Sequence, residues 1–431
     1  MRVAVIGTGY VGLVSGACMA ELGHQVTCLD VDAGKIERLK RGEIPIYEPG
    51  LEEIVKRNME NGRLAFTTSY EEAIPGAEAV SIAVGTPSAA DGTVDMRFVD
   101  AAAQEIGRHL TGYAVIATKS TVPVGTSERV AASIRENATH PFDVVSNPET
   151  LREGRAVYDF LHPSRIIIGA SSERAADVMT ELFAYIDCPK VVTDPRSAEL
   201  TKYAANAFLA TKISFINEVA HLCEDVGADV EAVAKGIGLD PRIGKDFLRA
   251  GLGWGGSCFP KDVLALAKLG ESLSHPLPVV NAAIRTNRMT RTRVVERLEK
   301  ALGGVEGKTV AILGLAFKDN TDDTRESAAV DIAKELWKRG ATVRAYDPVA
   351  RVSPEQMGFD LFHAVDPYEA AIGAHASVLA TEWEEFRTLD LGRLKSVMAG
   401  DVLMDGRNLL KPQDALAHGF IYLRVGKKII Q

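Results

Sequence analysis

The sequence predicts an α/β protein with two doubly wound domains joined by a central helical layer. Three observations lead to this prediction. Short apolar runs alternate with helical segments from residue 3 onward, a pattern typical of parallel strands covered by helices. Residues 198–223 then form a long helical run without Gly or Pro. Beyond a glycine-rich boundary at 303–307, the alternation of strands and helices resumes.

The length and composition are those of a globular protein with a sizeable core. A chain of 431 residues suggests about three domains, and 46% of the residues are hydrophobic. The formal net charge of −9 argues against a nucleic-acid partner, since such binding needs a basic face. An anionic substrate would therefore have to be held by locally placed cations.

The cysteines and the apolar runs bear on the compartment. The five cysteines, at 18, 28, 188, 223 and 258, show no CxxC or metal-ligand spacing. This scatter favours a reducing cytoplasm without disulfides, and no metal is expected. No run approaches the roughly 20 apolar residues of a membrane span, so no membrane association is expected.

The N-terminal segment predicts a dinucleotide site. Val3–Ile6 is typical of a buried strand, and it leads into Gly7-Thr-Gly-Tyr-Val-Gly12, which opens a helix to about Leu22. A second strand, Gln25 to Leu29, ends on Asp30. The glycines permit a tight turn and close approach of a pyrophosphate at the helix N-terminus. Asp30 is placed to accept from ribose hydroxyls, and with Asp32 it would repel a 2′-phosphate. The segment therefore favours NAD over NADP in a Rossmann-like domain.

Polar motifs follow three further predicted strands. The strands Ala79–Val84, Ala114–Thr118 and Asp143–Ser146 precede Gly85-Thr86-Pro87, Lys119-Ser-Thr-Val-Pro123 and Asn147-Pro148-Glu149, respectively. Later strands are expected at 165–168 and 190–192. The carboxyl edge of a doubly wound sheet is where ligands bind, although ordinary turns carry the same residue types.

Two long helices are expected in the middle of the chain, at 198–223 and at 279 to about 302. Lys202 and Asn206 are four residues apart and hence lie on one face of the first helix. A solvated lysine is an alternative, yet the flanking residues look half-buried. Two long helices between α/β halves indicate a spacer and dimerisation layer.

A glycine loop between these helices contains a candidate nucleophile. Four of the six residues 251–256 are glycine, which lets the backbone fold tightly and approach a ligand closely. Pro260 is expected as the first residue of a helix, which places Cys258 just outside the N-terminus. The helix dipole there favours the thiolate. Lys261 is a cation opposing that dipole. Cys258 could also be a small buried hydrophobic residue, and Asp262 a first-turn acid.

The C-terminal part forms a second α/β unit, with a strand beginning near Lys308 and others at 342–346, 377–380 and 402–404. Only Gly314 of a dinucleotide fingerprint is present, so a second NAD is not expected. The loops 318–325 and 405–407 carry cations suited to phosphates, or they are surface ion-pair loops. The predicted domains are residues 1–196, which bind NAD, the central helices 197–302, and 303–431.

Motifs across all three predicted domains identify a resemblance. They are GTGYVG (7–12), PIYEPGL (45–51), KSTVPVGT (119–126), NPETLREG (147–154), KYAANAFLATKISFINE (202–218), GWGGSCFPKD (253–262) and LGLAFKDNTDDTRES (313–327). With these motifs in this order, the chain resembles the UDP-glucose/GDP-mannose dehydrogenase family. GGSCFPKD and PIYEPGL resemble the branch that acts on UDP-glucose. Thr150 and Trp254 depart from the family, which usually has Phe at the first position and Phe or Tyr at the second.

The resemblance implies roles for individual residues. Those implied to contact NAD are Gly7, Gly9, Tyr10, Val11, Gly12, Asp30, Lys35, Thr86, Thr121, Glu153, Lys261 and Arg325. Those implied to hold the UDP-sugar are Glu149, Leu151, Arg152, Glu153, Lys202, Asn206, Arg249, Gly253, Gly255, Phe317, Lys318 and Arg407, with Arg242 reaching in from a neighbouring subunit of a homodimer or larger homo-oligomer. The catalytic set would be Cys258, Lys202, Asp262, Thr121, Glu149 and Asn206.

The implied reaction oxidises the primary alcohol of UDP-glucose to a carboxylate by two successive hydride transfers. Lys202 would stabilise an oxyanion in the first step. The Cys258 thiolate would add to the aldehyde, and the resulting thiohemiacetal would become a thioester that water hydrolyses. The same chemistry on GDP-mannose or a UDP-N-acetyl sugar is an alternative. A one-step hydroxyacid dehydrogenase of the 6-phosphogluconate type and a non-catalytic binder are more distant alternatives, and neither would need Cys258.

Overall fold

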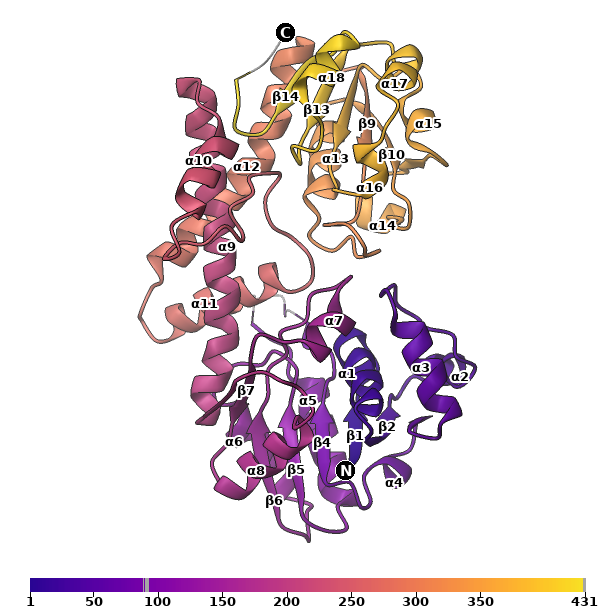
Figure 1. The fold of residues 1–431 in the computed structure, drawn as a ribbon, viewed down its shortest axis with the longest axis vertical. Helices are drawn as coiled ribbons and strands as arrows, with labels where there is room; N and C mark the ends of the chain where they lie inside the picture. Colours follow the sequence, from indigo (N-terminus) through magenta and orange to yellow (C-terminus); the bar gives the residue numbers. More distant parts are fainter. Residues whose placement is uncertain (88, 90–92, 429–431) are drawn as a thin grey trace. The chain divides into compact units, whose positions relative to one another are not determined.

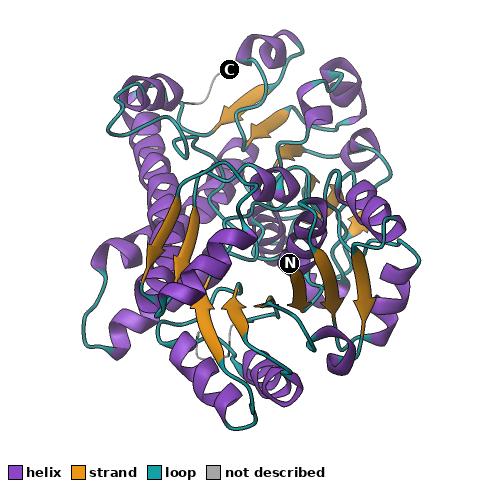
Figure 2. Cartoon of the chain, turned by 60° about the horizontal axis from the view of Figure 1, so that its bottom comes forward, coloured by secondary structure: helices purple, strands orange, loops and turns teal. Residues whose placement is uncertain are grey.

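The computed structural model describes residues 1–87, 89 and 93–428. The chain divides into two compact units, Met1–Ala205 and Asn206–Gln431. Each unit contains one sheet with helices packed against it (Figure 1; Figure 2). The helix α9, Pro195–Val226, contributes its first residues to the first unit and the remainder to the second.

The first unit is built on an eight-stranded sheet in the order β3-β2-β1-β4-β5-β6-β7-β8. All neighbours pair in parallel except β6 and β7, which meet in one antiparallel pair, Ser146 with Gly169. The strands are β1 Arg2–Ile6, β2 Gln25–Leu29, β3 Leu64–Thr67, β4 Ala79–Ile82, β5 Ala114–Thr118, β6 Phe142–Ser146, β7 Ile166–Gly169 and β8 Lys190–Thr193. The helices are α1 Tyr10–Glu21, α2 Ala33–Lys40, α3 Leu51–Glu60, α4 Tyr70–Ala73, α5 Arg97–His109, α6 Thr126–Arg135, α7 Ala156–Leu161 and α8 Glu173–Leu182.

The strands of this unit are apolar because both faces of the sheet are buried. Val3 and Val5 pack into one hydrophobic cluster, whereas Ala4 and Ile6 pack into another. Successive side chains of a strand point to opposite faces, so a strand covered on both sides has no polar face. The chain order reverses between β1 and β4, which places a ligand crevice at the carboxyl ends of these two strands.

The second unit has a six-stranded, all-parallel sheet in the order β11-β10-β9-β12-β13-β14. Its strands are β9 Thr309–Leu313, β10 Thr342–Tyr346, β11 Phe362–His363, β12 Ala376–Leu379, β13 Val402–Asp405 and β14 Ile421–Arg424. Its helices are α10 Val230–Gly238, α11 Phe259–Ser272, α12 Pro278–Leu302, α13 Ala328–Lys338, α14 Pro354–Met357, α15 Pro367–Ala371, α16 Glu384–Arg387, α17 Leu391–Val397 and α18 Pro412–Ala417. One large hydrophobic cluster lies in this unit, and a smaller one surrounds Trp254.

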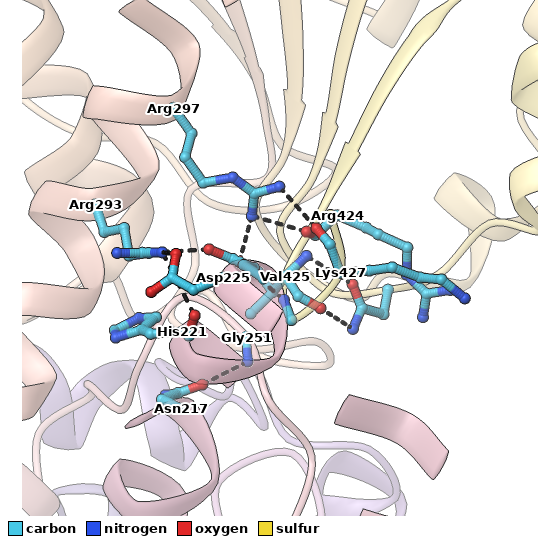
Figure 3. Close-up of polar contacts among 12 residues, drawn as sticks. Asn217, His221, Asp225, Gly251, Arg293, Arg297, Arg424, Val425 and Lys427 are labelled. Carbon is cyan, nitrogen blue, oxygen red and sulfur yellow. Dashed lines mark hydrogen bonds and ion pairs between the residues drawn. The ribbon is translucent and has the colours of Figure 1, made fainter. Parts of the chain in front are cut away.

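Ion pairs and hydrogen bonds connect the long helices to the end of the chain (Figure 3). Arg293 of α12 pairs with Asp225 of α9 at 3.1 Å. Arg297 donates to the carbonyl oxygens of Arg424 at 2.8 Å and Lys427 at 3.2 Å. Earlier in α9, the Asn217 side chain accepts from the Gly251 amide at 2.8 Å. These contacts hold the glycine loop and the C-terminal segment against the helices.

The predicted α/β class and the two sheets with long helices between them are confirmed. Several predicted bounds were wrong by a few residues. The first long helix was expected at 198–223 but begins at Pro195 and ends at Val226, because the proline fits the first helical turn, where no N–H is needed. Within the described part of the chain, no helix combines the length and apolar character that a bilayer crossing needs.

Candidate active site

The turn between β1 and α1 has the geometry of a phosphate cradle. Gly7 has a φ of +99°, and a Cβ there would meet the Ala83 carbonyl oxygen at 2.7 Å. A Cβ on Gly12 would lie 1.9 Å from the Gly7 carbonyl oxygen. At Gly9, the N-cap of α1, a Cβ would have no described atom within 4 Å. The space beside Gly9 is therefore open at the N-terminus of α1, where a pyrophosphate fits.

Asp30 stands directly after β2 and is held as a carboxylate. One of its oxygens accepts from the amide and the hydroxyl of Thr8, both at 2.8 Å, and pairs with Lys35 Nζ at 2.9 Å. Burial by itself would raise the pKa of Asp30, but the hydrogen bonds from Thr8 and Lys35 outweigh it and hold the pKa below its ordinary value. An ionised acceptor at this place suits the ribose of NAD.

The buried Glu48 fixes the loop that follows β6, a function that the sequence reasoning missed. Its carboxylate accepts from the Tyr10 hydroxyl and from the amides of Gly154, at 2.8 Å, and Val157, at 3.3 Å. Tyr10 also accepts from the Gly154 amide at 2.8 Å. Glu48 belongs to the PIYEPGL segment, so the motif was visible, but Gly154 and Val157 lie more than a hundred residues away from it in the sequence.

The predicted residues Glu149 and Lys202 form a buried ion pair. Lys202 Nζ lies 2.7 Å from Glu149 Oε1, and the two side chains are 9% and 4% exposed. The second oxygen of Glu149 accepts from the Leu151 amide at 2.5 Å. Both residues were expected in the substrate site, and the first unit brings them together although they are 53 positions apart.

The other residues predicted in this unit lie around the same edge of the sheet. Thr86 and Thr121 follow β4 and β5 and are both half-buried. Glu153 is half-buried in the loop that Glu48 holds. Arg152 is more exposed and pairs with Asp159 at 2.6 Å.

Cys258 is the N-cap residue of α11. The helix begins at Phe259, so Pro260 is its second residue rather than its first as predicted; proline is tolerated there because the first-turn N–H groups have no partner in the helix. The thiol is half-buried, and its Sγ lies 3.6 Å from Ser257 Oγ. The dipole of the 14-residue helix acts on this sulfur in the direction that favours the thiolate.

Asp262 connects three of the predicted residues. Its carboxylate is fully buried and accepts from Asn206 Nδ2 at 2.6 Å and from Lys261 Nζ at 2.7 Å. Lys261 therefore does not stand as an isolated cation at the helix N-terminus, because the carboxylate beside it neutralises its charge. The Asp262 amide also donates to the Cys258 carbonyl oxygen at 2.9 Å.

The glycine loop passes so close to its neighbours that larger residues would not fit. A Cβ on Gly255 would meet the Glu326 carbonyl oxygen at 2.2 Å, and one on Gly256 would meet the Phe317 ring at 2.7 Å. Gly253 adopts a φ of +98°. Between them, the indole of Trp254 is buried and donates to Ser214 Oγ at 2.9 Å. Trp254 thus points into the helical core of the second unit.

The candidate phosphate-binding cations of this unit have different surroundings. Arg407 is half-buried and donates to the carbonyl oxygens of Ala380 at 2.8 Å and Phe317 at 3.2 Å. Arg249 pairs with Glu382 and donates to the Arg407 carbonyl oxygen at 2.9 Å. Lys318 Nζ lies 5.6 Å from the centroid of the Phe317 ring.

Arg325 and Arg242 differ from these cations in their exposure. Their side chains are 66% and 87% exposed, and each forms an ion pair with a nearby aspartate. The Arg325 carbonyl oxygen accepts from the Gly256 amide at 3.1 Å, so its backbone supports the glycine loop.

Models of one family match the chain along most of its length. Residues 1–187 match the NAD binding domain of the UDP-glucose/GDP-mannose dehydrogenase family, residues 196–289 its central domain, and residues 311–412 its UDP binding domain. Among curated proteins, the chain is 47% identical to a UDP-glucose 6-dehydrogenase of Bacillus subtilis (100% of this chain, 94% of the relative). It is 49% identical to that of Rhizobium meliloti (99% and 100%).

Solved structures agree with these similarities. A UDP-glucose dehydrogenase from the archaeon Pyrobaculum islandicum superimposes with a TM-score of 0.92 at 44% identity, over 98% of this chain and 96% of that one. A UDP-D-ManNAc dehydrogenase from Pyrococcus horikoshii superimposes with a TM-score of 0.88 at 27% identity, over 99% of each chain.

Proposed function

Because the chain belongs to the UDP-glucose/GDP-mannose dehydrogenase family, we propose that it oxidises UDP-glucose to UDP-glucuronate in two NAD-dependent steps. Bound NAD accepts a hydride in each step, and the cradle at Gly7 and Gly12 together with ionised Asp30 fits it. The observation that carries the proposal is the position of Cys258 at the N-terminus of α11, beside the buried Asp262–Asn206 contact. An enzyme that only oxidises an alcohol to a carbonyl group does not need a nucleophilic thiol.

The first oxidation turns the primary alcohol into an aldehyde. It needs a proton acceptor for the hydroxyl and a cation that stabilises the developing oxyanion. Lys202 would supply the cation, and its charge is preserved at a buried position by Glu149. Thr121, at the end of β5, would help to orient the reacting group.

The second oxidation requires a covalent bond to the protein. The Cys258 thiolate adds to the aldehyde carbon, and the thiohemiacetal that forms loses the second hydride to give a thioester. Water then hydrolyses the thioester, which releases the carboxylate and restores the thiol. Asp262 and Asn206 would hold the reacting oxygen near the sulfur, and Glu149 would accept the proton of the attacking water.

The UDP part of the substrate would be held by the second unit. Arg407, Arg249 and Lys318 carry the cations that a pyrophosphate needs in a protein of net charge −9. Phe317 and the glycines at 253 and 255 would form the close wall of the sugar pocket. The remaining implied contacts are Leu151, Arg152 and Glu153 for the substrate, and Tyr10, Val11, Lys35, Thr86, Glu153, Lys261 and Arg325 for NAD.

We further propose a homodimer in which α9 lies at the interface. Phe208, Phe215 and Leu222 are 51–67% exposed and are spaced by seven residues, so they form one apolar stripe. Each copy presents the same stripe, which is what a twofold interface needs. Arg242, exposed beyond α10, would reach the neighbouring subunit's site.

We also propose a division into three domains and a cytoplasmic location. A division into residues 1–196, 197–302 and 303–431 separates the NAD, helical and UDP functions. A cytoplasmic location agrees with the five cysteines, all of them described and none in a disulfide.

The test is the stoichiometry of NADH release. Purified protein with limiting UDP-glucose and excess NAD should release two NADH per sugar and form UDP-glucuronate. One NADH per sugar would indicate the one-step alternative. GDP-mannose and UDP-N-acetyl sugars in parallel reactions test the alternative substrates. NADP in place of NAD tests the ribose argument at Asp30, and equal rates with both would contradict it.

A further inference from the structure

Asn287, on α12, has a buried side-chain amide that the proposed chemistry does not use. The residue is 5% exposed. Its Oδ1 accepts from the Trp254 amide at 2.8 Å, and its Nδ2 donates to the Trp254 carbonyl oxygen at 2.9 Å. A neighbouring strand supplies the same two bonds to a residue of a sheet. One side chain of α12 therefore holds both backbone polar groups of a residue in the glycine loop.

A second side chain of α12 holds the same residue. Arg291 lies four positions after Asn287 and hence on the same face of the helix. Its Nη2 donates to the Trp254 carbonyl oxygen at 2.7 Å and to the Glu326 carbonyl oxygen at 3.1 Å. A Cβ on Gly253 would collide with Asn287 Oδ1, so the loop is closely fitted to α12 at this point.

The Trp254 side chain connects this anchor to the helix that begins after Cys258. Its indole N–H donates to Ser214 Oγ of α9 at 2.9 Å. The ring belongs to a small hydrophobic cluster that includes Val263 of α11, and Phe259 packs against the same cluster. Phe259 is the first residue of α11 and follows Cys258 directly. The anchor on α12 is therefore connected through one indole ring to the first turn of α11.

The segment between Trp254 and Cys258 needs such an anchor. Two of the three residues 255–257 are glycines, which have more conformational freedom than any other residue. Within the segment, the Gly256 amide donates to the Arg325 carbonyl oxygen at 3.1 Å. Its N-terminal end is fixed by the contacts of Trp254. Because a misplacement of about 1 Å can cost about a hundredfold in rate, these contacts bear on the chemistry of the thiol.

We propose that Asn287 is a positioning residue, which acts through Trp254 to hold the Cys258 sulfur at attacking distance from the aldehyde carbon. This inference rests on the proposed function. In the second oxidation the sulfur forms a bond to that carbon, the electron pair of the carbonyl bond moves to the oxygen, and the oxygen takes up a proton. The thiohemiacetal that results can lose a hydride. The first oxidation forms no bond to sulfur, so a loosened loop slows the second oxidation more.

The test compares variants of the full-length protein. Asn287→Ala removes both bonds to Trp254. Asn287→Asp keeps the size of the side chain but places an oxygen against the Trp254 carbonyl oxygen, and it decides the test if Asn287→Ala does not fold. The matched control is Asn408→Ala, because Asn408 holds the Val425 backbone by the same two kinds of bond, at 3.0 and 3.1 Å, in the same unit.

Each variant receives the UDP-sugar aldehyde at a saturating concentration, once with NAD and once with NADH. Chromatography measures the UDP-glucuronate formed with NAD, which requires the sulfur. Loss of NADH absorbance measures reduction to the alcohol, which does not. Both Asn287 variants should form the acid about a hundredfold more slowly than wild type, whereas their reduction rates should fall by a much smaller factor. Asn408→Ala should keep the wild-type ratio of the two rates.

Variants of Trp254 test the path of contacts. Trp254→Ala should show the same selective loss as Asn287→Ala. The double variant should lose no more than the more severe single variant, because the two residues act along one path. Trp254→Phe removes the indole hydrogen bond but keeps an aromatic ring in the cluster, so it should stay much closer to wild type than Trp254→Ala.

The melting temperature separates positioning from a general loss of stability. Asn287→Ala and Asn408→Ala each lose two hydrogen bonds, so both should melt on the order of a few degrees below wild type. At this similar stability, the loss of acid formation should occur only in Asn287→Ala.

Three results would overturn the inference. They are a wild-type ratio of the two rates in the folded Asn287 variants, the same selective loss in Asn408→Ala, and effects of Asn287→Ala and Trp254→Ala that multiply in the double variant. Failure of the proposed function is a different outcome. In that case the wild-type protein itself would not oxidise UDP-glucose, whatever residue occupies position 287.

Discussion

Asp262 and Glu149, two residues of the proposed site, are both buried carboxylates with fixed partners. Each carboxylate is buried, and each has a cationic partner at 2.7 Å, Lys261 for Asp262 and Lys202 for Glu149. Buried charges persist when they are paired and hydrogen-bonded, so the two groups are held in fixed orientations. Cys258 differs from them, because it is only half-buried.

At the residue scale we predict that Cys258 is needed for the second oxidation far more than for the first. An aldehyde has no hydride to transfer until a nucleophile has added, and Cys258→Ala removes that nucleophile. UDP-glucuronate formation should fall on the order of a thousandfold. The variant should still reduce the UDP-sugar aldehyde with NADH, because Lys202 and Asp262 remain.

The matched control is Cys188→Ala. Cys188 is also half-buried, but it belongs to the first unit, whereas Cys258 belongs to the second. Product analysis by chromatography measures the acid, and loss of NADH absorbance measures the reduction. Undiminished acid production by Cys258→Ala would mean that water adds directly to the aldehyde.

At the scale of elements, α9 has two functions. Its first turns place Lys202, and the next turn places Asn206. Its outer face has the apolar stripe of Phe208, Phe215 and Leu222, whereas Ala207, Ala210 and Ile216 are buried. One helix therefore has a buried side and an apolar side that remains exposed in the single chain, which is the observation behind the proposed dimer.

We predict that Phe208→Glu combined with Phe215→Glu converts the dimer to a monomer. Burying a phenylalanine contributes about 1.5–3 kcal/mol, and each is present twice in a symmetric interface, so the dissociation constant should rise at least about a hundredfold. Analytical ultracentrifugation at micromolar concentration measures the change. Val365→Glu, at another exposed apolar position, is the control. A wild-type protein that is monomeric and fully active at these concentrations would contradict the dimer.

At the scale of the whole molecule, the two sheets have different ligand chemistry. The first unit has the complete glycine turn and an ionised Asp30 for NAD. In the second unit the buried Asp347 accepts from the amides of Leu315 and Ala316, at 2.7 and 3.0 Å. A carboxylate of the protein thus accepts from the amides after β9, as Asp30 does from the Thr8 amide after β1.

This division predicts that Arg407→Ala affects one substrate and not the other. Loss of a cation that contacts phosphate should cost about 1.5–3 kcal/mol and so raise KM for UDP-glucose roughly 10- to 100-fold. KM for NAD should stay within about twofold. Arg393→Ala removes an exposed cation of the same unit and is the control. Steady-state kinetics with each substrate varied in turn measures both constants, and equal increases would place Arg407 elsewhere.

The strands were predicted with varying success. The bounds of β5 and β10 agree with the prediction, since each is a compact apolar run between clear turns. No prediction was made for β3, β11 and β14. These strands have two to four residues, and such short runs have no periodicity that distinguishes them from loops. Their identity as strands depends on pairing with β2, β10 and β13.

The sequence by itself determined the NAD turn with Asp30 and the position of Cys258 at a helix N-terminus. These features are local, because glycine, proline and capping preferences act over a few neighbouring residues. The tertiary structure alone decided that Lys202 pairs with Glu149, 53 positions away, and that Asn206 pairs with Asp262, 56 positions away. It also buried Lys119 among aromatic rings. Such contacts depend on how distant strands and helices pack, and the periodicity of a single segment does not record its partners.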